Sequence, residues 1–269
     1  MVPSLPVTQA RVFPPDDHVV VENLTKRFGD NTVLNDVSLV IPRGRTSVIL
    51  GGSGAGKTTF LRLLIGLDTA TSGHIWVDGE DMTALDDVAL NRVRRKFGMV
   101  FQYAALLDSL TVFENVAFPL REHTKMKEKE IKHEVLGKLA VLGLEGTDQR
   151  YPAEMSGGMR KRVGLARALI LKPEILIYDE PTSGLDPHTS RMVDDMIEET
   201  RGRFGVTNVV ISHDMTSAFR IAHNIGLLAG GRIVARGTPD ELLNGPNAEA
   251  RSFIAASGID ADRLSRVPD

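Results

Sequence analysis

A glycine-rich segment carries the residues with the clearest chemical role in this chain. Residues 51–59 read GGSGAGKTT and match the spacing G-x-x-x-x-G-K-[ST], in which backbone N–H groups surround phosphate oxygens. Lys57 would reach the β- and γ-phosphates, and the Thr58 hydroxyl would bind Mg²⁺. We therefore expect a nucleoside triphosphate with Mg²⁺ at this loop. Its candidate contact residues are Gly51, Ser53, Gly54, Ala55, Gly56, Lys57, Thr58 and Thr59.

Two consecutive acids follow a short apolar segment in the second half of the chain. Residues 175–178 read ILIY and are followed by Asp179 and Glu180. A buried strand that ends in a carboxylate commonly holds Mg²⁺ beside a phosphate-binding loop, so Asp179 is the expected metal ligand, directly or through water. Glu180 would face the attacking water as a general base if the chain turns at the strand end. The alternative is a pair of solvated acids, which Pro181 and the upstream loop argue against.

A second pair of glycines predicts a second phosphate contact. Ser156, Gly157 and Gly158 open a helical pattern, and a helix N-terminus of this kind offers free N–H groups to an anion. One nucleotide bound to one chain does not need two such sites. Two chains arranged head to tail do need them, because each chain then closes the nucleotide site of the other. The motif therefore predicts a homodimer that encloses two nucleotides.

The elements around these motifs alternate between strands and helices. Apolar or alternating runs predict strands at 18–24, 33–41, 46–50, 73–77, 97–102, 175–178, 206–212, 225–229 and 233–235. Helical patterns lie at 59–67, 112–144, 155–171, 187–204 and 215–222, with two short helices beyond 238. This alternation predicts a parallel sheet whose ligands lie at the carboxyl ends of the strands, and the glycine-rich loop follows such an end.

The composition narrows the class of protein. Of 269 residues, 42% are hydrophobic and 25% are charged, as in an ordinary soluble globular protein. The net charge of −3 gives no bulk attraction to nucleic acid, so no nucleic-acid partner is expected. The absence of cysteine excludes disulfides, thiolate catalysis and cysteine-based zinc sites. No apolar run approaches the roughly 18–20 residues that span a bilayer, and residues 1–15 lack the apolar core of a secretory signal.

The order of the motifs resembles that of the ATP-binding subunits of ABC transporters. Residues 51–59, 156–158 and 175–180 resemble the Walker A loop, the signature sequence and the Walker B strand of that family. The usual first and last signature residues, Leu and Gln, are replaced by Met155 and Met159, while the Ser and Gly contacts remain. The resemblance implies ATP and Mg²⁺ as cofactors and ATP hydrolysis as the activity.

The same resemblance implies roles for residues that the pattern alone does not single out. Gln102 resembles the glutamine that senses Mg²⁺, the attacking water and the membrane partner, and His213 resembles the switch histidine that contacts the γ-phosphate. Residues 183–186 resemble the D-loop, which crosses the dimer interface and places Asp186 beside the nucleotide. Phe28 lies where an aromatic ring stacks on adenine, with core packing as the alternative.

The resemblance covers about residues 18–240 and implies the fold. It is an α/β fold, the P-loop NTPase nucleotide-binding domain of ABC type. Such a domain has a parallel-sheet core, an antiparallel β subdomain and an α-helical subdomain, here at about 103–165. Residues 1–17 are expected to form a disordered lead, and residues 241–269 a short helical extension and tail.

The segment after Gln102 points to one group of these transporters. Residues 107–116 (LDSLTVFENV), 118–122 (FPLRE) and 156–162 (SGGMRKR) are similar to the ATPases of the Mla and Mce phospholipid systems. This implies phospholipid transport between membranes, with an integral membrane permease and an MCE-domain lipid-binding protein as partners. A STAS-domain regulatory subunit is a further expected partner. The expected location is the cytoplasmic face of the inner membrane, where the permease would hold the chain.

Three other functions remain open from the sequence. An ABC importer for amino acids or metals would share the nucleotide motifs, and only residues 103–122 argue against it. A soluble ABC ATPase of DNA repair or translation typically carries coiled-coil insertions or two cassettes, which residues 51–213 lack. A P-loop kinase would need neither the 156–158 motif nor the pair of Asp186 and His213. Co-purification with a permease separates the first two, and phosphorylation of an acceptor would reveal the third.

Overall fold

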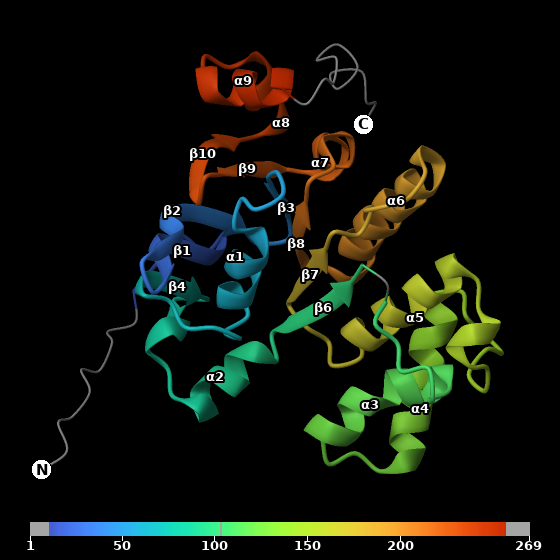
Figure 1. Cartoon of the computed structure of the whole chain (residues 1–269). Helices are drawn as coiled ribbons and strands as arrows, with labels where there is room; N and C mark the ends of the chain where they lie inside the picture. The colour runs from blue at the N-terminus through green and yellow to red at the C-terminus, as the bar shows by residue number, and fades with distance from the viewer. Residues whose placement is uncertain (1–10, 103, 257–269) are drawn as a thin grey trace, which may run out of the picture.

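Two β-sheets form the framework of the protein, which the computed structural model describes over residues 11–102 and 104–256 (Figure 1). The larger sheet has six strands in the order β10-β9-β3-β8-β7-β6. These strands are β3 (Thr46–Leu50), β6 (Phe97–Phe101), β7 (Ile175–Asp179), β8 (Thr207–Ser212), β9 (Asn224–Ala229) and β10 (Arg232–Gly237). Every neighbouring pair is parallel except the β9–β10 hairpin. The predicted parallel-sheet core is thereby confirmed.

The smaller sheet is antiparallel, with the strand order β2-β1-β4-β5. Its strands are β1 (Asp17–Phe28), β2 (Asn31–Pro42), β4 (Ser72–Val77) and β5 (Glu80–Asp81). The first two strands are longer than the runs predicted at 18–24 and 33–41. Their pairing continues through several register shifts, with Asn23 and Asp36 in left-handed backbone conformations. Such irregularities interrupt the ladder locally and bend the strands.

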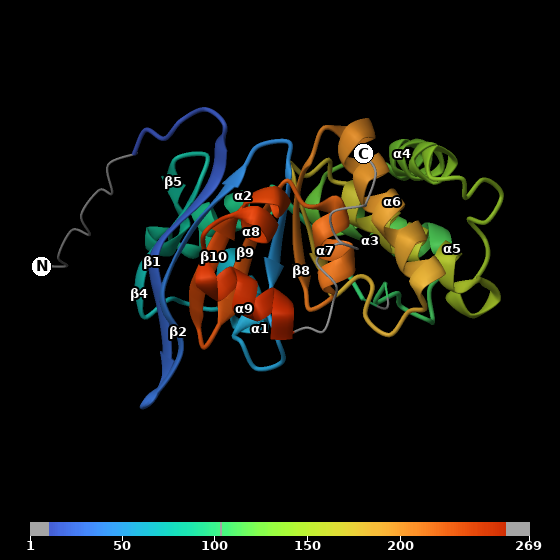
Figure 2. The same cartoon turned by 90° about the horizontal axis from the view of Figure 1, so that it is seen from above.

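Helices cover the two faces of the larger sheet and form a separate group beyond β6 (Figures 1 and 2). One face packs on α1 (Lys57–Leu64) and the smaller sheet, and the other packs on α6 (Pro187–Phe204) and α7 (Met215–Ile221). The last two described helices, α8 (Pro239–Asn244) and α9 (Ala248–Ala256), pack on this second side as well. Residues 175–178 of β7 alternate between the two cores, so all four are buried before the strand ends at Asp179.

The helical subdomain has its own core. Its helices are α3 (Val112–His123), α4 (Glu128–Val141) and α5 (Gly157–Leu169). The single helical pattern predicted over 112–144 is therefore two helices. The first ends where the Thr124 hydroxyl donates to the Leu120 carbonyl at 2.6 Å, and the second begins where Glu130 accepts from the Lys127 N–H. Local capping ends the helix where the apolar pattern continues.

Some described elements have no counterpart among the predicted strands and helices. They are the two-residue strand β5, α2 (Asp87–Arg94) and the 3₁₀ turns η1 (Met82–Ala84) and η2 (Pro152–Glu154). At the N-terminus, residues 11–16 contact the smaller sheet, in contrast to the expected disordered lead. Arg11 pairs with Glu22 at 2.6 Å, and the ring of Phe13 lies 5.5 Å from that of Trp76. Residues 1–10 and the tail 257–269 lie outside the described residues.

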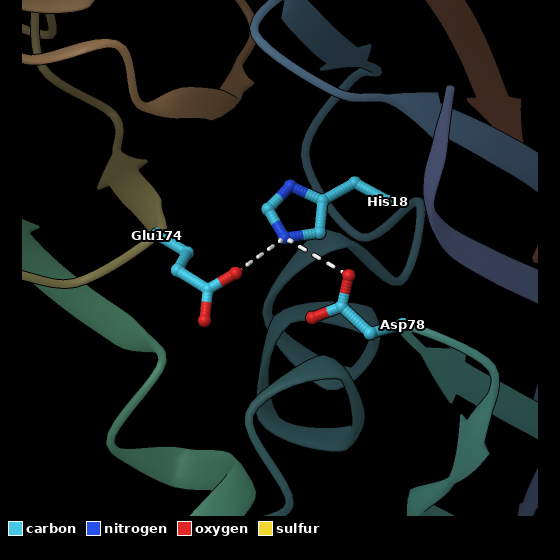
Figure 3. A group of neighbouring side chains, drawn as sticks. All are labelled: His18, Asp78 and Glu174. Carbon is cyan, nitrogen blue, oxygen red and sulfur yellow. Dashed lines mark ion pairs between the residues drawn. The ribbon is translucent and has the colours of Figure 1, made fainter. Parts of the chain in front are cut away.

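A network of charged side chains joins the two sheets at the end away from the glycine-rich loop. Figure 3 shows the buried His18 facing Asp78 and Glu174, with its Nε2 3.8 Å and 3.5 Å from their carboxylate oxygens. Burial, and secondarily the charge of Arg43, hold the pKa of His18 below its usual value. Arg43 and Lys96 each pair with both acids. Because two cations already balance two carboxylates, we interpret this group as a structural ion network, not as a metal site.

Among the helices of residues 11–102 and 104–256, none combines the length and the apolar character needed to cross a membrane.

Candidate nucleotide-binding site

The P-loop (residues 51–59) lies between the carboxyl end of β3 and the start of α1, as the sequence predicts. Two glycines are required there by space. A Cβ on Gly51 would lie 2.4 Å from the Leu228 carbonyl oxygen, and one on Gly56 would lie 2.8 Å from the Leu34 side chain. Gly56 also caps α1 in the left-handed region at φ 104°, without a side-chain hydrogen bond to the helix. The first N–H groups of α1 therefore remain available to an anion.

Lys57 holds its ammonium group between the loop and an acid. Its Nζ donates to the carbonyls of Gly51 at 2.7 Å and Gly52 at 3.1 Å, and it lies 3.3 Å from Glu180. The ammonium is mostly buried, so its charge acts with little screening. From this position the ammonium group can contact both Glu180 and a phosphate bound in the P-loop.

Glu180 departs from the strand that precedes it. Its backbone is left-handed at φ 49°, and its N–H donates to the Ile211 carbonyl at 2.9 Å. The carboxylate accepts from the His213 N–H at 3.2 Å and pairs with the His213 ring Nδ1 at 2.6 Å. A non-glycine residue in this conformation is strained, and such strain is typical of functional sites. The turn brings Glu180 and His213 together, 33 positions apart in the chain.

The oxygen donors for a metal ion lie in the same cavity. Thr58 and Asp179 both line it, and a hydroxyl with a carboxylate is the donor set that Mg²⁺ prefers. Burial, reinforced by the nearby charge of Glu180, raises the pKa of Asp179, while Lys57 opposes the shift. A divalent cation would reduce the electrostatic repulsion between the carboxylates of Asp179 and Glu180. The residues present thus fit the expected ion.

The cavity has a volume of about 700 Å³ and gathers most of the predicted site. It includes Gly52, which lies within the glycine-rich segment but was not selected as a contact, and two residues from outside every motif, Val33 and Ile211. No motif marks them, because Val33 enters from β2 and Ile211 from β8 only through the fold. The cavity is lined by Val33, Gly52, Ser53, Gly54, Ala55, Gly56, Lys57, Thr58, Thr59, Asp179, Glu180, Ile211 and His213.

Three other predicted site residues do not line this cavity: Gly51, Gln102 and Phe28. Gln102 directly follows Phe101, which pairs with Asp179 in the parallel register of β6 and β7. Phe28 ends β1, is 51% exposed, and has the Lys26 ammonium 4.7 Å from its ring centroid. Its exposure disfavours the core-packing alternative and leaves a ring face available for stacking.

The signature motif (Ser156–Gly158) and Asp186 also lie away from the P-loop cavity. Ser156 caps α5, accepts from the Met159 N–H at 3.3 Å, and is exposed together with both glycines. Met155 is buried in the helical core, so methionine serves where the family usually has leucine. Asp186 caps α6, and its hydrogen bonds with Thr189 lower its pKa. In the described part of the chain, none of these groups lines the P-loop cavity.

Comparisons with known proteins agree with this geometry. A family model described as ABC transporter matches residues 34–183. The probable ribonucleotide transport ATP-binding protein mkl of Mycobacterium tuberculosis is 41% identical over 96% of this chain and 72% of its own. The intermembrane phospholipid transport system ATP-binding protein MlaF of Escherichia coli is 40% identical over 84% of each chain. The methionine import ATP-binding protein MetN of Cutibacterium acnes is 41% identical over 90% of this chain and 67% of its own.

A solved structure shows the same fold. The ATP-binding cassette MJ0796, in a dimeric post-hydrolysis state with ADP and Pi, superimposes with a TM-score of 0.71. It is 34% identical, and the match covers 82% of this chain and 98% of that one. The names of the three relatives differ in the transported substance. All three describe an ATP-binding protein.

Proposed function

The chain belongs to the ABC transporter family and is an ATPase, and we propose that it powers phospholipid transport through a separate membrane permease. The observation that carries the ATPase mechanism is the cavity in which Lys57, Glu180 and His213 converge beside the P-loop. The cargo proposal rests on the similarity to MlaF, which extends over 84% of both chains, and on residues 107–122.

In this proposal two copies of the chain enclose two MgATP molecules. Each nucleotide lies between the P-loop of one copy and the signature motif of the other. This arrangement would explain why Ser156 and Asp186 are exposed and face no phosphate site within one chain. ATP then binds the closed dimer more tightly than the open one, and that difference in affinity drives closure. The dimeric MJ0796 cassette supports this arrangement.

Hydrolysis uses groups that the fold already holds in place. Glu180 takes a proton from the water that attacks the γ-phosphate, while the bond to the β-phosphate oxygen breaks. Lys57 and the P-loop N–H groups balance the charge that develops on the phosphate oxygens. Mg²⁺, held by Thr58 and Asp179, would supply further charge balance. His213 orients Glu180 through their 2.6 Å contact and reaches the γ-phosphate. Loss of the bridging phosphate then releases the dimer.

The proposed partners follow from the cargo. They are the permease, an MCE-domain lipid-binding protein and a STAS-domain subunit, with the chain at the cytoplasmic face of the inner membrane. The surface available to a permease lies after Gln102, where Leu107 is 44% exposed and Phe118 is 46% exposed. The similarity to MetN keeps an importer of small solutes as the alternative.

A pull-down from detergent-solubilised native membranes tests the proposal. The tagged chain is recovered, and mass spectrometry identifies its protein partners and bound lipids. A permease with an MCE-domain protein and phospholipid supports the proposal. An amino-acid or metal permease would retain the ATPase and overturn the cargo. Soluble partners alone would contradict a role in transport.

A further inference from the structure

The chain segment that follows Gln102 is held on α5 by one arginine. Arg167 donates from its two terminal nitrogens to the carbonyls of Ala104 at 2.7 Å and Ala105 at 2.8 Å. Both contacts are to the backbone, so they fix the path of the loop whatever its side chains are. The cap of the same helix, Ser156, lies about 16 Å away along its axis.

The loop and the helix also touch closely at Gly164. A Cβ placed there would lie 3.0 Å from the Ala104 Cβ and 3.3 Å from its carbonyl oxygen. Ala104 is buried, and it and Ala105 have left-handed backbones at φ 61° and 44°. Two successive non-glycine residues in this region are costly and persist only when their surroundings hold them. The hydrogen bonds from Arg167 and the packing against Gly164 stabilise these two backbone conformations.

Arg167 forms no ion pair in the described part of the chain. Its guanidinium is partly buried, and burial alone lowers its pKa. Among the ion pairs of residues 11–102 and 104–256, none involves Arg167. A charge removed from water without a counter-ion must be compensated by hydrogen bonds. The two loop carbonyls provide this compensation.

The next part of the loop is fixed to the same subdomain from α3. Asn115 is fully buried, and its amide nitrogen donates to the carbonyls of Leu107, Leu110 and Thr111. Its amide oxygen accepts from the Leu107 N–H at 2.8 Å. The loop is therefore attached to the helical subdomain at two places, and Gln102 lies on the side of the larger sheet.

We propose that Arg167 is a positioning residue that makes this loop and α5 move as one body. When Gln102 engages the nucleotide site, the carbonyls of Ala104 and Ala105 transmit its displacement to Arg167. The helix then carries that displacement to Ser156, which closes on the partner's nucleotide. This inference rests on the proposed function, because it needs the nucleotide site at Gln102 and the composite site at Ser156.

The first test is the variant Arg167→Ala. We expect kcat for ATP to fall about tenfold to a hundredfold, as a misplaced catalytic geometry does, while KM stays within about twofold. In the Glu180→Gln background, Arg167→Ala should still bind ATP but form less dimer. Arg167→Lys, which can reach a carbonyl with one ammonium, should recover part of the rate. The matched control is Arg203→Ala, which also loses a donor to a backbone carbonyl, that of Val141.

A methyl swap provides a second test that leaves Arg167 in place. Gly164→Ala adds a methyl group against Ala104 and should lower kcat by pushing the loop off the helix. The double variant Gly164→Ala with Ala104→Gly moves the methyl from loop to helix and should restore much of the rate. If Arg167→Ala does not fold, this pair decides the question.

The outcomes separate the inference from the proposed function. A wild-type chain without ATPase activity, alone or with its permease, would contradict the function itself. An active wild type with an equally active Arg167→Ala would overturn the inference alone. An equal loss of ATP affinity and turnover would overturn it as well, because the arginine would then act on nucleotide binding. A drop in kcat with preserved KM, and rescue by the methyl swap, support it.

Discussion

At the scale of single residues, Glu180 is the proposed general base, and it lines the P-loop cavity. Its left-handed backbone turns the carboxylate off the line of β7, toward Lys57 and His213. The apolar run and the acid pair predict this site from the sequence, because a buried strand must end before a charged residue can reach the cavity. Val33 was not predictable in the same way, since only the folded hairpin brings it to the P-loop.

Replacing Glu180 with Gln separates binding from hydrolysis. The amide keeps the size of the side chain but cannot take a proton from water. We expect phosphate release to slow by at least about a hundredfold, with ATP affinity within about threefold of wild type. Phosphate release and calorimetric titration measure the two quantities. Glu199→Gln, an exposed acid on α6, serves as the control and should behave as wild type.

The buried Asp194 predicts a dependence of stability on pH. Burial raises its pKa to about 6, although a hydrogen bond from Ser217 and the charge of Arg220 oppose the shift. The folded chain therefore binds this proton more tightly than the unfolded chain, whose carboxyl has the usual value of 3.8. Ionisation of Asp194 thus costs stability above pH 6, and the cost disappears as the pH falls toward 4.

Asp194→Asn removes this cost and keeps an oxygen that can accept from Ser217. We expect the variant to be more stable than wild type by roughly 1–3 kcal/mol at pH 7.5, with a difference that shrinks toward pH 4. Arg220 keeps Asp195 as a partner at 2.5 Å. Urea unfolding at a series of pH values measures the difference. A constant difference across the range would show that Asp194 does not titrate as described.

At the scale of elements, local signals explain what was and was not predictable. The predicted bounds of 187–204 match α6, because Pro187 at its start and the left-handed Gly205 at its end punctuate the helix. The division of 112–144 into α3 and α4 was missed, since Thr124 and Glu130 end and restart the helix through short hydrogen bonds inside a continuous helical pattern. Only the folded backbone shows that these side-chain hydrogen bonds replace the helical ones.

Asn115 is the element-scale residue with the largest expected effect on stability. It satisfies four backbone groups of the loop before α3 from a fully buried position. Asn115→Leu keeps the volume but removes the amide from the Leu107 N–H and the Leu110 carbonyl, while the Leu107 and Thr111 carbonyls keep a backbone donor each. We therefore expect a loss of about 2–4 kcal/mol in the free energy of unfolding. Chemical denaturation measures it, with the exposed Asn244→Ala as control. A loss below about 0.5 kcal/mol would mean that water replaces the amide.

At the scale of the whole molecule, the P-loop and the signature motif of one chain lie apart. The P-loop cavity is fully formed in one chain, while the signature motif lies exposed at the tip of α5 in the separate helical group (Figure 1). The sequence predicts this division, because two phosphate-binding helix starts exceed the need of one nucleotide. The nucleotide site does not determine which substance is transported. In the proposed function, that choice depends on the surfaces that bind the permease and other partner proteins.

A substitution at the exposed Phe118 on α3 tests whether the permease binds at this surface. Phe118→Glu places a charge on an apolar surface, so we expect loss of permease from the pull-down with ATP binding retained. Val88→Glu changes an apolar residue that is 82% exposed on α2, and it should leave recovery of the permease unchanged. Equal recovery with both variants would place the permease on another surface.

The most direct test of the composite site is the molar mass of Glu180→Gln in solution, measured by light scattering after size-exclusion chromatography. With saturating MgATP we predict twice the 29.4 kDa of one chain, and without nucleotide the mass of one chain. Adding Gly157→Asp should preserve ATP binding and abolish the dimer, because the acid repels the partner's γ-phosphate. A single-chain mass for Glu180→Gln when every P-loop holds ATP would contradict the sandwiched nucleotide.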